Sequence, residues 1–376
     1  MDKELRRQAR QAAADPAMAW ELRIGRPGQT GRVEIRDAVH LWEPTPGWLN
    51  TASYGLPPRP AVEALRRALG EWQRGDAPWF VWDASTGRAR AGFARLVGVE
   101  TDDVAVGSAV SQLLAPVAAS LPPGSRVVVP EIEFTSNLFP WLVQDLDVRT
   151  VPLSEVADAV DGRTALVAFS VVQSATGEVS PVEDILAAAR ANGALVVADA
   201  SQAAGWLPID ATRFDVLVCA AYKWLMAPRG AAFCYVAPAV RERIRPVAAG
   251  WYAGEEPGGE PHAYYGPPLR LAPSARRFDL SPAWFSFVGA APALDVLNAV
   301  GVERVHAHDV ALADRFLRGL GLPPAGSAIV SVDLPGAAER LAAAGVRAAV
   351  RDGRLRAAFH LYTTEADVDL ALNALT

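Results

Sequence analysis

Cysteine and lysine are both scarce in this chain of 376 residues. Its two cysteines, Cys219 and Cys234, lie in apolar segments, too few for a disulfide framework and without the spacing of a metal site. We predict that both are reduced core residues, which favours a cytoplasmic location. Of the 36 basic residues only two are lysines, Lys3 and Lys223, so Lys223 is the only lysine outside the N-terminal segment.

Long apolar runs and basic stripes are also missing. No apolar run approaches the roughly 18 residues that span a bilayer, and residues 1–16 are charged throughout, without the apolar region of a signal peptide. Export and membrane anchoring are therefore not expected. The net charge is −6 and the basic residues are scattered among acidic ones, which makes nucleic acid an unexpected partner.

Composition and length predict a globular protein with a large core. Hydrophobic residues make up 51% of the chain and charged residues 21%, which leaves little room for disorder. The length exceeds that at which one core usually keeps growing. We expect one large domain with a smaller companion.

Hydrophobic periodicity predicts an α/β fold. After proline breakers, apolar residues recur at helical spacing from Arg59, at Val62, Leu65, Leu69 and Trp72. Further along, short β-branched runs alternate with Ala- and Leu-rich helical stretches such as 182–191. Near-continuous apolar strands separated by helices are typical of a mostly parallel sheet covered on both faces. The strands are expected at 127–129, 165–169, 195–198, 216–219 and 231–235.

A second unit is expected towards the C-terminus. Residues 250–273 are rich in Gly, Pro and Tyr and resemble a loop. The pattern divides the chain into an N-terminal segment (1–48), a large domain (49–285) and a small α+β domain (286–376). The small domain is expected to contain helices at 290–300, 337–344 and 365–375, and strands at 328–332, 348–350 and 355–360.

The strongest local signal is VVADASQAAG (196–205) followed by DVLVCAAYKWLMAPRG (215–230). Asp199 ends one buried strand and Lys223 follows the next, so both side chains can reach one crevice at the carboxyl edge of the sheet. Taken singly, such an Asp is often a helix cap and such a Lys a surface charge. Lys223, however, lies in an apolar stretch where an unpaired ammonium is costly to bury. Pyridoxal 5'-phosphate (PLP) needs this pair: the acid keeps its ring nitrogen protonated and the amine forms a Schiff base.

These segments, in this order, resemble the class V group of fold-type I PLP enzymes. The group includes cysteine desulfurases, kynureninases, isopenicillin N epimerase-like proteins and ergothioneine C–S lyases. The resemblance runs from LNTASYGLPPR (49–59) to LRAAFHLYTTEADVD (355–369). It implies a fold-type I PLP-dependent transferase, with a mostly parallel seven-stranded sheet in the large domain, a small α+β C-terminal domain, and assembly as a homodimer.

The resemblance also implies which residues bind PLP. Asp199 pairs with the pyridine nitrogen, Gln202 lies near the phenolic oxygen, Lys223 carries the Schiff base and Tyr222 reaches the phosphate. In GSAVSQLL (107–114), a helix begins whose N–H groups favour a phosphate, although Gly-Ser before a helix is often only a cap. In the family this turn binds the PLP phosphate, so the resemblance implies that Ala109, Val110 and the hydroxyl of Ser111 bind it here.

Three further cofactor contacts are implied. Phe134, in EIEFTSNLFPW, takes the place of a histidine that stacks on the pyridine ring, and the alternative is an ordinary core phenylalanine. Ser174, in VVQSATG, matches a residue near the cofactor oxygen. Ser281, in RRFDLSPAW, matches a phosphate contact made across the subunit interface, where Leu280 replaces the usual glycine.

For the substrate, the resemblance points to Arg356 and Asn50. Arg356 takes the position that pairs bidentately with an amino-acid carboxylate, for which a guanidinium is suited; the alternative is a surface arginine. Arg354 is expected to be solvated. Asn50 matches a residue that lines the same pocket, although Asn50 and Ser174 are both also typical of turns.

Departures from the family narrow the reaction. In the family, desulfurases that form a persulfide use a cysteine in the C-terminal domain, and this chain has no cysteine after Cys234. Desulfurase chemistry through a persulfide is therefore not expected. The pair His306 and His308 lacks further ligands at metal spacing, so we expect a solvated helix face and no metal.

Three functions remain open. The resemblance favours a β- or γ-elimination lyase of the C–S lyase kind, acting on a small amino-acid substrate, because most relatives cleave bonds at or beyond Cβ. An aminotransferase or epimerase would use the same Lys223, and no residue separates these reactions. A PLP-fold protein that only binds is disfavoured by the presence of Asp199, Gln202, Lys223 and Arg356.

Overall fold

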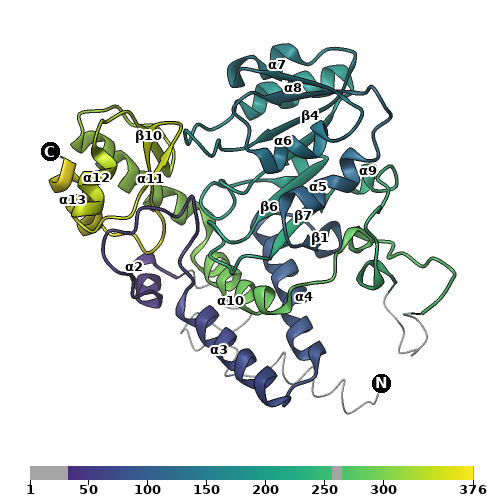
Figure 1. Cartoon of the computed structure of the whole chain (residues 1–376), viewed down its shortest axis with the longest axis horizontal. Coiled ribbons are helices and arrows are strands. Elements are labelled where there is room, and N and C mark those ends of the chain that lie inside the picture. Colours follow the sequence, from purple (N-terminus) through teal and green to yellow (C-terminus); the bar gives the residue numbers. More distant parts are fainter. Residues whose placement is uncertain (1–32, 256–264, 376) are drawn as a thin grey trace.

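The computed structural model describes residues 33–255 and 265–375 (Figure 1). Lys3, the charged segment 1–16 and part of the predicted loop 250–273 lie outside these ranges. Two sheets organise the described chain, one of seven strands and one of three.

The large sheet is mostly parallel, as the sequence predicts. Only β7 runs antiparallel, to both of its neighbours, β1 and β6. The residues of β5, β6 and β7 are almost completely buried, as expected for strands covered on both faces. In spatial order the strands are β1 (Val104–Gly107), β7 (Ala232–Val236), β6 (Val216–Ala220), β5 (Leu195–Asp199), β4 (Thr164–Ser170), β2 (Arg126–Pro130) and β3 (Asp147–Val151).

Helices cover both faces of this sheet because successive strand residues point to opposite sides. In β5, Val196 and Ala198 join one core, and Val197 joins the other. The first core is covered by α4 (Trp79–Val97), α7 (Val156–Ala159), α8 (Val182–Asn192) and α10 (Trp284–Val300). The second is covered by α5 (Val110–Ala118) and α6 (Thr135–Leu142). The predicted helix from Arg59 is α3 (Arg59–Arg74), which packs against α10.

The small sheet lies beside the large one (Figure 1). Its strands are antiparallel, with β10 (Arg354–Ala358) between β8 (Ile329–Val332) and β9 (Ala349–Arg351). One face packs on α11 (Val302–Gly319), α12 (Ala337–Ala343) and α13 (Glu365–Leu375), through residues such as Leu355. Ala358, on the other face, joins the core of the large sheet.

The N-terminal part of the described chain joins the small sheet. Trp48 bridges to Arg347, and Asn50 bridges to Ala358. The predicted domain boundary at 285 falls in the first turn of α10, a helix that packs on α3 and α4; the division into 1–48, 49–285 and 286–376 stays a prediction.

A buried ion pair anchors the segment that precedes α10. Asp279 accepts hydrogen bonds from both terminal nitrogens of Arg90, at 3.0 and 2.7 Å, and from the Val106 backbone N–H at 2.8 Å. The next residue, Leu280, donates its N–H to the Val106 carbonyl. Residues 279–280 are therefore held against β1, close to where α5 begins.

Within the described ranges no single helix is both long and apolar enough to cross a membrane. Taken together, α10 and α11 are long and apolar enough by length and composition, but the two helices meet at an angle of 85°.

Candidate active site

A pocket opens at the carboxyl ends of the central strands, where the sequence predicts a crevice. Asp199 is the last residue of β5, and its strand partner Ser170 is the last of β4. Lys223 follows β6 in a turn. The pocket is lined by Ser108, Ala109, Val110, Phe134, Ser136, Ser170, Ser174, Asp199, Ser201, Gln202, Ala220, Tyr222, Lys223 and Arg229.

The turn that carries Lys223 is held tightly by backbone contacts. The Met226 N–H donates to the Lys223 carbonyl at 3.0 Å, and Met226 has a positive φ of 54°. Gly55 donates to the Tyr222 carbonyl, and a Cβ at Gly55 would lie 2.0 Å from the Lys223 oxygen. A Cβ at Gly205 would lie 2.6 Å from the Trp224 oxygen. Only glycine allows these two approaches, so the turn is clamped from two sides.

Asp199 and Lys223 form a buried acid and amine in one pocket, each less than a tenth exposed. Burial raises the pKa of Asp199, which hydrogen bonds from Ser201 and the charge of Lys223 oppose. Burial lowers the pKa of Lys223 to about 8, which the charge of Asp199 opposes, while the charges of Arg356 and Arg229 lower it further. The amine is therefore more easily deprotonated than that of an exposed lysine.

A second buried carboxylate, Glu133, supports the pocket wall. It accepts hydrogen bonds from the backbone N–H groups of Phe134, at 2.9 Å, and of Ser170, at 2.7 Å, and from the Ser170 hydroxyl. Burial, and to a lesser extent the charge of Asp199, raises the pKa of Glu133. The carboxylate ties the start of α6 to the end of β4.

Gln202 connects three segments around the pocket. Its amide nitrogen donates to the Ala52 carbonyl and to the Ser174 hydroxyl, both at 3.0 Å. Its amide oxygen accepts from the Trp224 indole at 2.8 Å. The indole donor fixes the orientation of the amide, so its N–H₂ group points towards Ser174.

Two aromatic rings flank the amine. The Lys223 Nζ lies 5.4 Å from the centre of the Phe134 ring and 5.8 Å from that of Tyr222. Phe134 is 45% exposed, which is not the burial of an ordinary core phenylalanine. The Arg229 guanidinium lies 4.7 Å from the Tyr222 ring centre, a distance at which cation and ring attract.

The start of α5 contributes backbone donors. Ala109 is the extended residue before the helix, and no side chain caps the first turn. The first N–H groups of α5 therefore have no partner within the helix, and both Ala109 and Val110 line the pocket. Ser108 is among the residues that line the pocket and Ser111 is not; the phosphate contact of Ser111 stays a prediction.

Arg356 lies on β10, next to the pocket and 2% exposed, so it is not a surface arginine. Its terminal nitrogens donate to the Ser174 carbonyl and hydroxyl and, at 3.0 Å, to the Ser53 hydroxyl. Its Nε is buried without a partner among the described residues. Burial, together with the charge of Arg351, lowers the pKa of Arg356 to about 10. The guanidinium therefore keeps a donor that is available to a ligand.

Besides Ser111 and Arg356, two further expected site residues, Asn50 and Ser281, are not among the residues that line the pocket of the single chain. Asn50 bridges to Ala358 through its backbone, and its buried Oδ1 has no partner in the described ranges. Ser281 is exposed. Conversely, the sequence pattern did not reveal Arg229 and several small residues. These small residues are Ser108, Ser136, Ser170, Ser201 and Ala220. Each lies at a strand end or within two residues of a predicted site residue, and this proximity is the signal by which the sequence could have indicated them.

The histidine pair is not the solvated face that was expected. His306 is half-buried and stacks on Trp206, with ring centres 5.7 Å apart. The neighbouring Asp309 is fully buried and meets His360 Nδ1 at 2.8 Å, and His360 Nε2 lies 3.0 Å from the Trp224 carbonyl. In the part of the chain that the structure describes, no cluster of His, Cys, Asp or Glu could hold a metal ion. Both cysteines are buried free thiols, as predicted.

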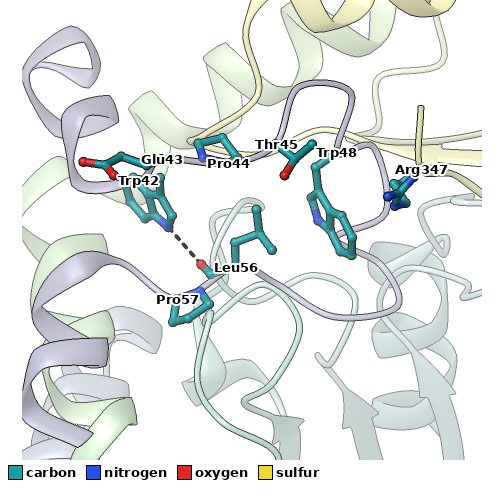
Figure 2. A pocket seen from close by; sticks show the side chains of 8 residues that line it. All are labelled: Trp42, Glu43, Pro44, Thr45, Trp48, Leu56, Pro57 and Arg347. Atoms are coloured by element: carbon teal, nitrogen blue, oxygen red, sulfur yellow. Dashed lines mark hydrogen bonds between the residues drawn. The ribbon is translucent and has the colours of Figure 1, made fainter. Parts of the chain in front are cut away.

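A second hollow, of about 340 Å³, is lined by residues of the segment 42–57 and by Arg347 (Figure 2). Leu56 stands between the indoles of Trp42 and Trp48, and the Trp42 indole donates to the Leu56 carbonyl at 2.9 Å. No lysine lines this second hollow, whereas a carboxylate and an amine, those of Asp199 and Lys223, line the strand-end pocket. The strand-end pocket is therefore the candidate active site.

The chain matches known proteins along most of its length. The family model "aminotransferase class V" matches residues 83–333. The chain is 32% identical over 233 residues to the uncharacterized aminotransferase YcbU of Bacillus subtilis (strain 168), which covers 58% of this chain and 60% of that protein. It is 29% identical to isopenicillin N epimerase of Streptomyces clavuligerus, over 89% of this chain and 96% of the epimerase.

A solved structure shows a similar fold. The cystine C–S lyase C-DES, in complex with its product cysteine persulfide, has a TM-score of 0.78 at 21% identity, and the match covers 88% of this chain and 97% of that one. A variant of C-DES with glycine covalently linked to the PLP cofactor has a TM-score of 0.79 at 20% identity. At such identities the likeness is one of fold.

Proposed function

Because the chain belongs to the class V aminotransferase family, it is a PLP-dependent enzyme that acts on an amino acid, and we propose that its reaction is a β- or γ-elimination of the C–S lyase kind in small-molecule metabolism. The observation that carries this proposal is the single amine of the pocket. Lys223 is the only lysine among the lining residues, and no histidine or cysteine accompanies it there. Elimination needs only one base at Cα, so this lysine is sufficient for it; transamination, or epimerisation by one base, could use the same lysine, and the products separate the three.

The residues of the pocket fit the cofactor. Asp199, held by the Ser201 N–H at 2.7 Å, would meet the pyridine nitrogen, and Gln202 and Ser174 would lie near the phenolic oxygen. The N–H groups at the start of α5 suit a phosphate, with Tyr222 beside them, and Phe134 would cover the ring. When bound, PLP supplies an electron sink for negative charge at Cα.

Lys223 is proposed both to attach the cofactor and to move the proton. A general base works best with a pKa near the working pH, and burial brings the pKa of Lys223 down to about 8. The glycine clamp on its turn restricts the amine to one region of the pocket. Arg356, whose buried Nε has no partner among the described residues, would hold the substrate carboxylate.

Other reactions of the family remain alternatives. An aminotransferase or an epimerase would use the same lysine, and the C-DES likeness concerns fold alone. A protein that only binds PLP is disfavoured, because a buried acid, a buried amine and a buried guanidinium with a free donor are costly to keep together without a reaction that uses them.

Product analysis tests the proposal. With β-chloro-L-alanine and S-substituted cysteines, elimination releases a 2-oxo acid and ammonia, and the cofactor spectrum returns to its starting form. Transamination would instead leave the cofactor in its amine form. Epimerisation would exchange the Cα hydrogen with deuterium from solvent and release no ammonia. Either of the last two outcomes would replace elimination as the function.

The depressed pKa of Lys223 makes a pH prediction. Only the neutral amine attacks an aldehyde, so the initial rate at which the cofactor-free protein captures PLP should rise with pH through about 8 and level off above it. An ordinary lysine would keep gaining rate towards 10.5. Absorbance measured over a pH series reports the midpoint. A rate that continues to climb towards 10.5 contradicts the buried environment of Lys223.

We also propose that the protein is a homodimer. Three large aromatic side chains near the ends of α3 and α4 are partly exposed, namely Trp72, Trp79 and Trp251, and exposed apolar patches often mark interfaces. Closed two-fold dimers are the commonest assembly. Ser281, exposed in the single chain, would then be able to reach the partner's phosphate. Sedimentation of an active monomer would refute this proposal.

A further inference from the structure

One face of the small sheet carries a row of arginines towards the pocket. Arg354 and Arg356 are two residues apart on β10, so their side chains leave the same face. Arg351 on β9 is the strand partner of Arg354, and directly paired residues share a face. Arg356 is buried, while Arg351 and Arg354 are exposed.

Arg351 and Arg356 converge on one hydroxyl group. The Ser53 Oγ accepts a hydrogen bond from Arg356 Nη2 at 3.0 Å and lies 3.4 Å from Arg351 Nη2. The charge of Arg351 contributes to the lowered pKa of Arg356, as expected for two cations close together. Two guanidinium groups thus lie next to each other beside the pocket of Lys223.

No carboxylate balances these two charges within the described ranges. The side-chain contacts of Arg351 are the Val350 carbonyl and Ser53, and those of Arg356 are Ser53 and Ser174. Other arginines of the chain do have acidic partners, for example Arg90 with Asp279 and Arg315 with Asp369. The unpartnered Nε of Arg356 leaves a buried donor free. A bound anion would compensate the buried charge of Arg356 and would also lie within reach of Arg351.

From this pair we infer the class of substrate: an amino acid with a second anionic group close to its α-carboxylate. Arg356 binds the α-carboxylate, and Arg351, at the exposed end of the pair, binds the second group. The inference rests on the proposed function. Guanidinium groups recognise carboxylates and other planar or tetrahedral oxyanions through paired hydrogen bonds, so the second group is a carboxylate, sulfonate or phosphate.

Binding of unreactive analogues to the PLP-loaded enzyme tests the inference. Succinate, glutarate and adipate carry two carboxylates, and butyrate carries one; none has an amino group to react. Their dissociation constants follow from changes in the cofactor absorption at constant ionic strength. Because Arg351 is exposed, its ion pair is worth up to about 1 kcal/mol, so the best dicarboxylate should bind up to roughly fivefold more tightly than butyrate.

Three variants separate the possible outcomes. Arg351→Gln should weaken the best dicarboxylate to the level of butyrate and leave butyrate itself unchanged. Arg354→Gln is the matched control: it removes an equal charge from the same face, where Arg354 is bonded to Ser331, and it should change neither affinity. Arg356→Gln should weaken both ligands.

Contrary results point to different failures. If Arg351→Gln weakens butyrate as much as the dicarboxylates, the two arginines share one carboxylate and the inference is overturned. Equal affinities for all four ligands in the unaltered enzyme also overturn it, while the proposed function stands. If the protein shows no cofactor absorption, the proposed function and the inference fail together. If the cofactor is bound and none of the four ligands binds, the inference alone is overturned, and product analysis still decides the proposed function.

Discussion

Replacement of Lys223 by alanine is expected to abolish turnover and to remove the covalent attachment of PLP. General acid–base catalysis contributes about 10²–10⁴-fold, and Lys223→Ala removes both the base and the attachment point, so kcat should fall at least this far. The neighbouring cations cannot take over. The other basic side chains near the amine, Arg229 and Arg356, are guanidinium groups, which do not serve as general bases in proteins.

Borohydride reduction followed by peptide mass spectrometry measures the attachment directly. The chain has only two lysines, so the unaltered enzyme should give one labelled peptide, containing Lys223. Lys3→Ala is the matched control and should retain both label and activity. Added methylamine should partly restore turnover in Lys223→Ala, which a merely misfolded variant would not show. A labelled peptide that persists in Lys223→Ala would disprove the assignment.

Asp199→Asn is expected to lower kcat by about 100-fold or more while the protein still binds PLP. Asparagine matches aspartate in size and keeps an oxygen to accept the Ser201 N–H. It removes the negative charge that would keep the pyridine nitrogen protonated, and without that proton the ring is a weaker electron sink.

The same variant has a second readout, independent of turnover. Asp199 raises the pKa of Lys223 against the effect of burial, so its loss should lower that pKa further. The midpoint of PLP capture should therefore move to a pH below about 8. Asp147→Asn, on the exposed edge strand β3, serves as control and should change neither quantity. Near-normal kcat in Asp199→Asn would exclude its role beside the ring.

The central strands and the acid–amine pair could be predicted from the sequence because their determinants are local. Fully buried strands appear as short apolar runs, and parallel strands bring their carboxyl ends to one edge. Those two rules are sufficient to predict that Asp199 and Lys223 share one pocket. Arg356 needs more, namely the resemblance to a family.

Elements with mixed environments are harder to predict. The edge strand β3 (Asp147–Val151) exposes most of its residues and has no apolar run. Helix α4 (Trp79–Val97) packs on both the sheet and α10, so its apolar residues do not form one stripe. A Cβ at Gly92 would lie 3.0 Å from the Leu294 Cβ, a contact visible only once the two helices are in place.

Contacts between distant segments could not be predicted at all. Ser53 and Arg351 are almost 300 positions apart, and no sequence pattern in either segment predicts their contact. The exposure of Phe134 and the stacking of His306 on Trp206 likewise depend on how the loops and α11 pack against the large domain. Long-range packing decides such details, whereas periodicity and strand-end rules describe only local structure.

The short stretch from Arg356 to His360 has a consequence for substrate geometry. Arg356 faces the proposed carboxylate, and His360, four residues on, is held between Asp309 and the carbonyl of Trp224, the residue after Lys223. One rigid piece of backbone therefore sets the span between carboxylate and base. A carboxylate held by Arg356 would lie at a fixed distance from Lys223, so we expect a β-amino acid, longer by a methylene, to be a poorer substrate than the matching α-amino acid, as kcat/KM for the two would show.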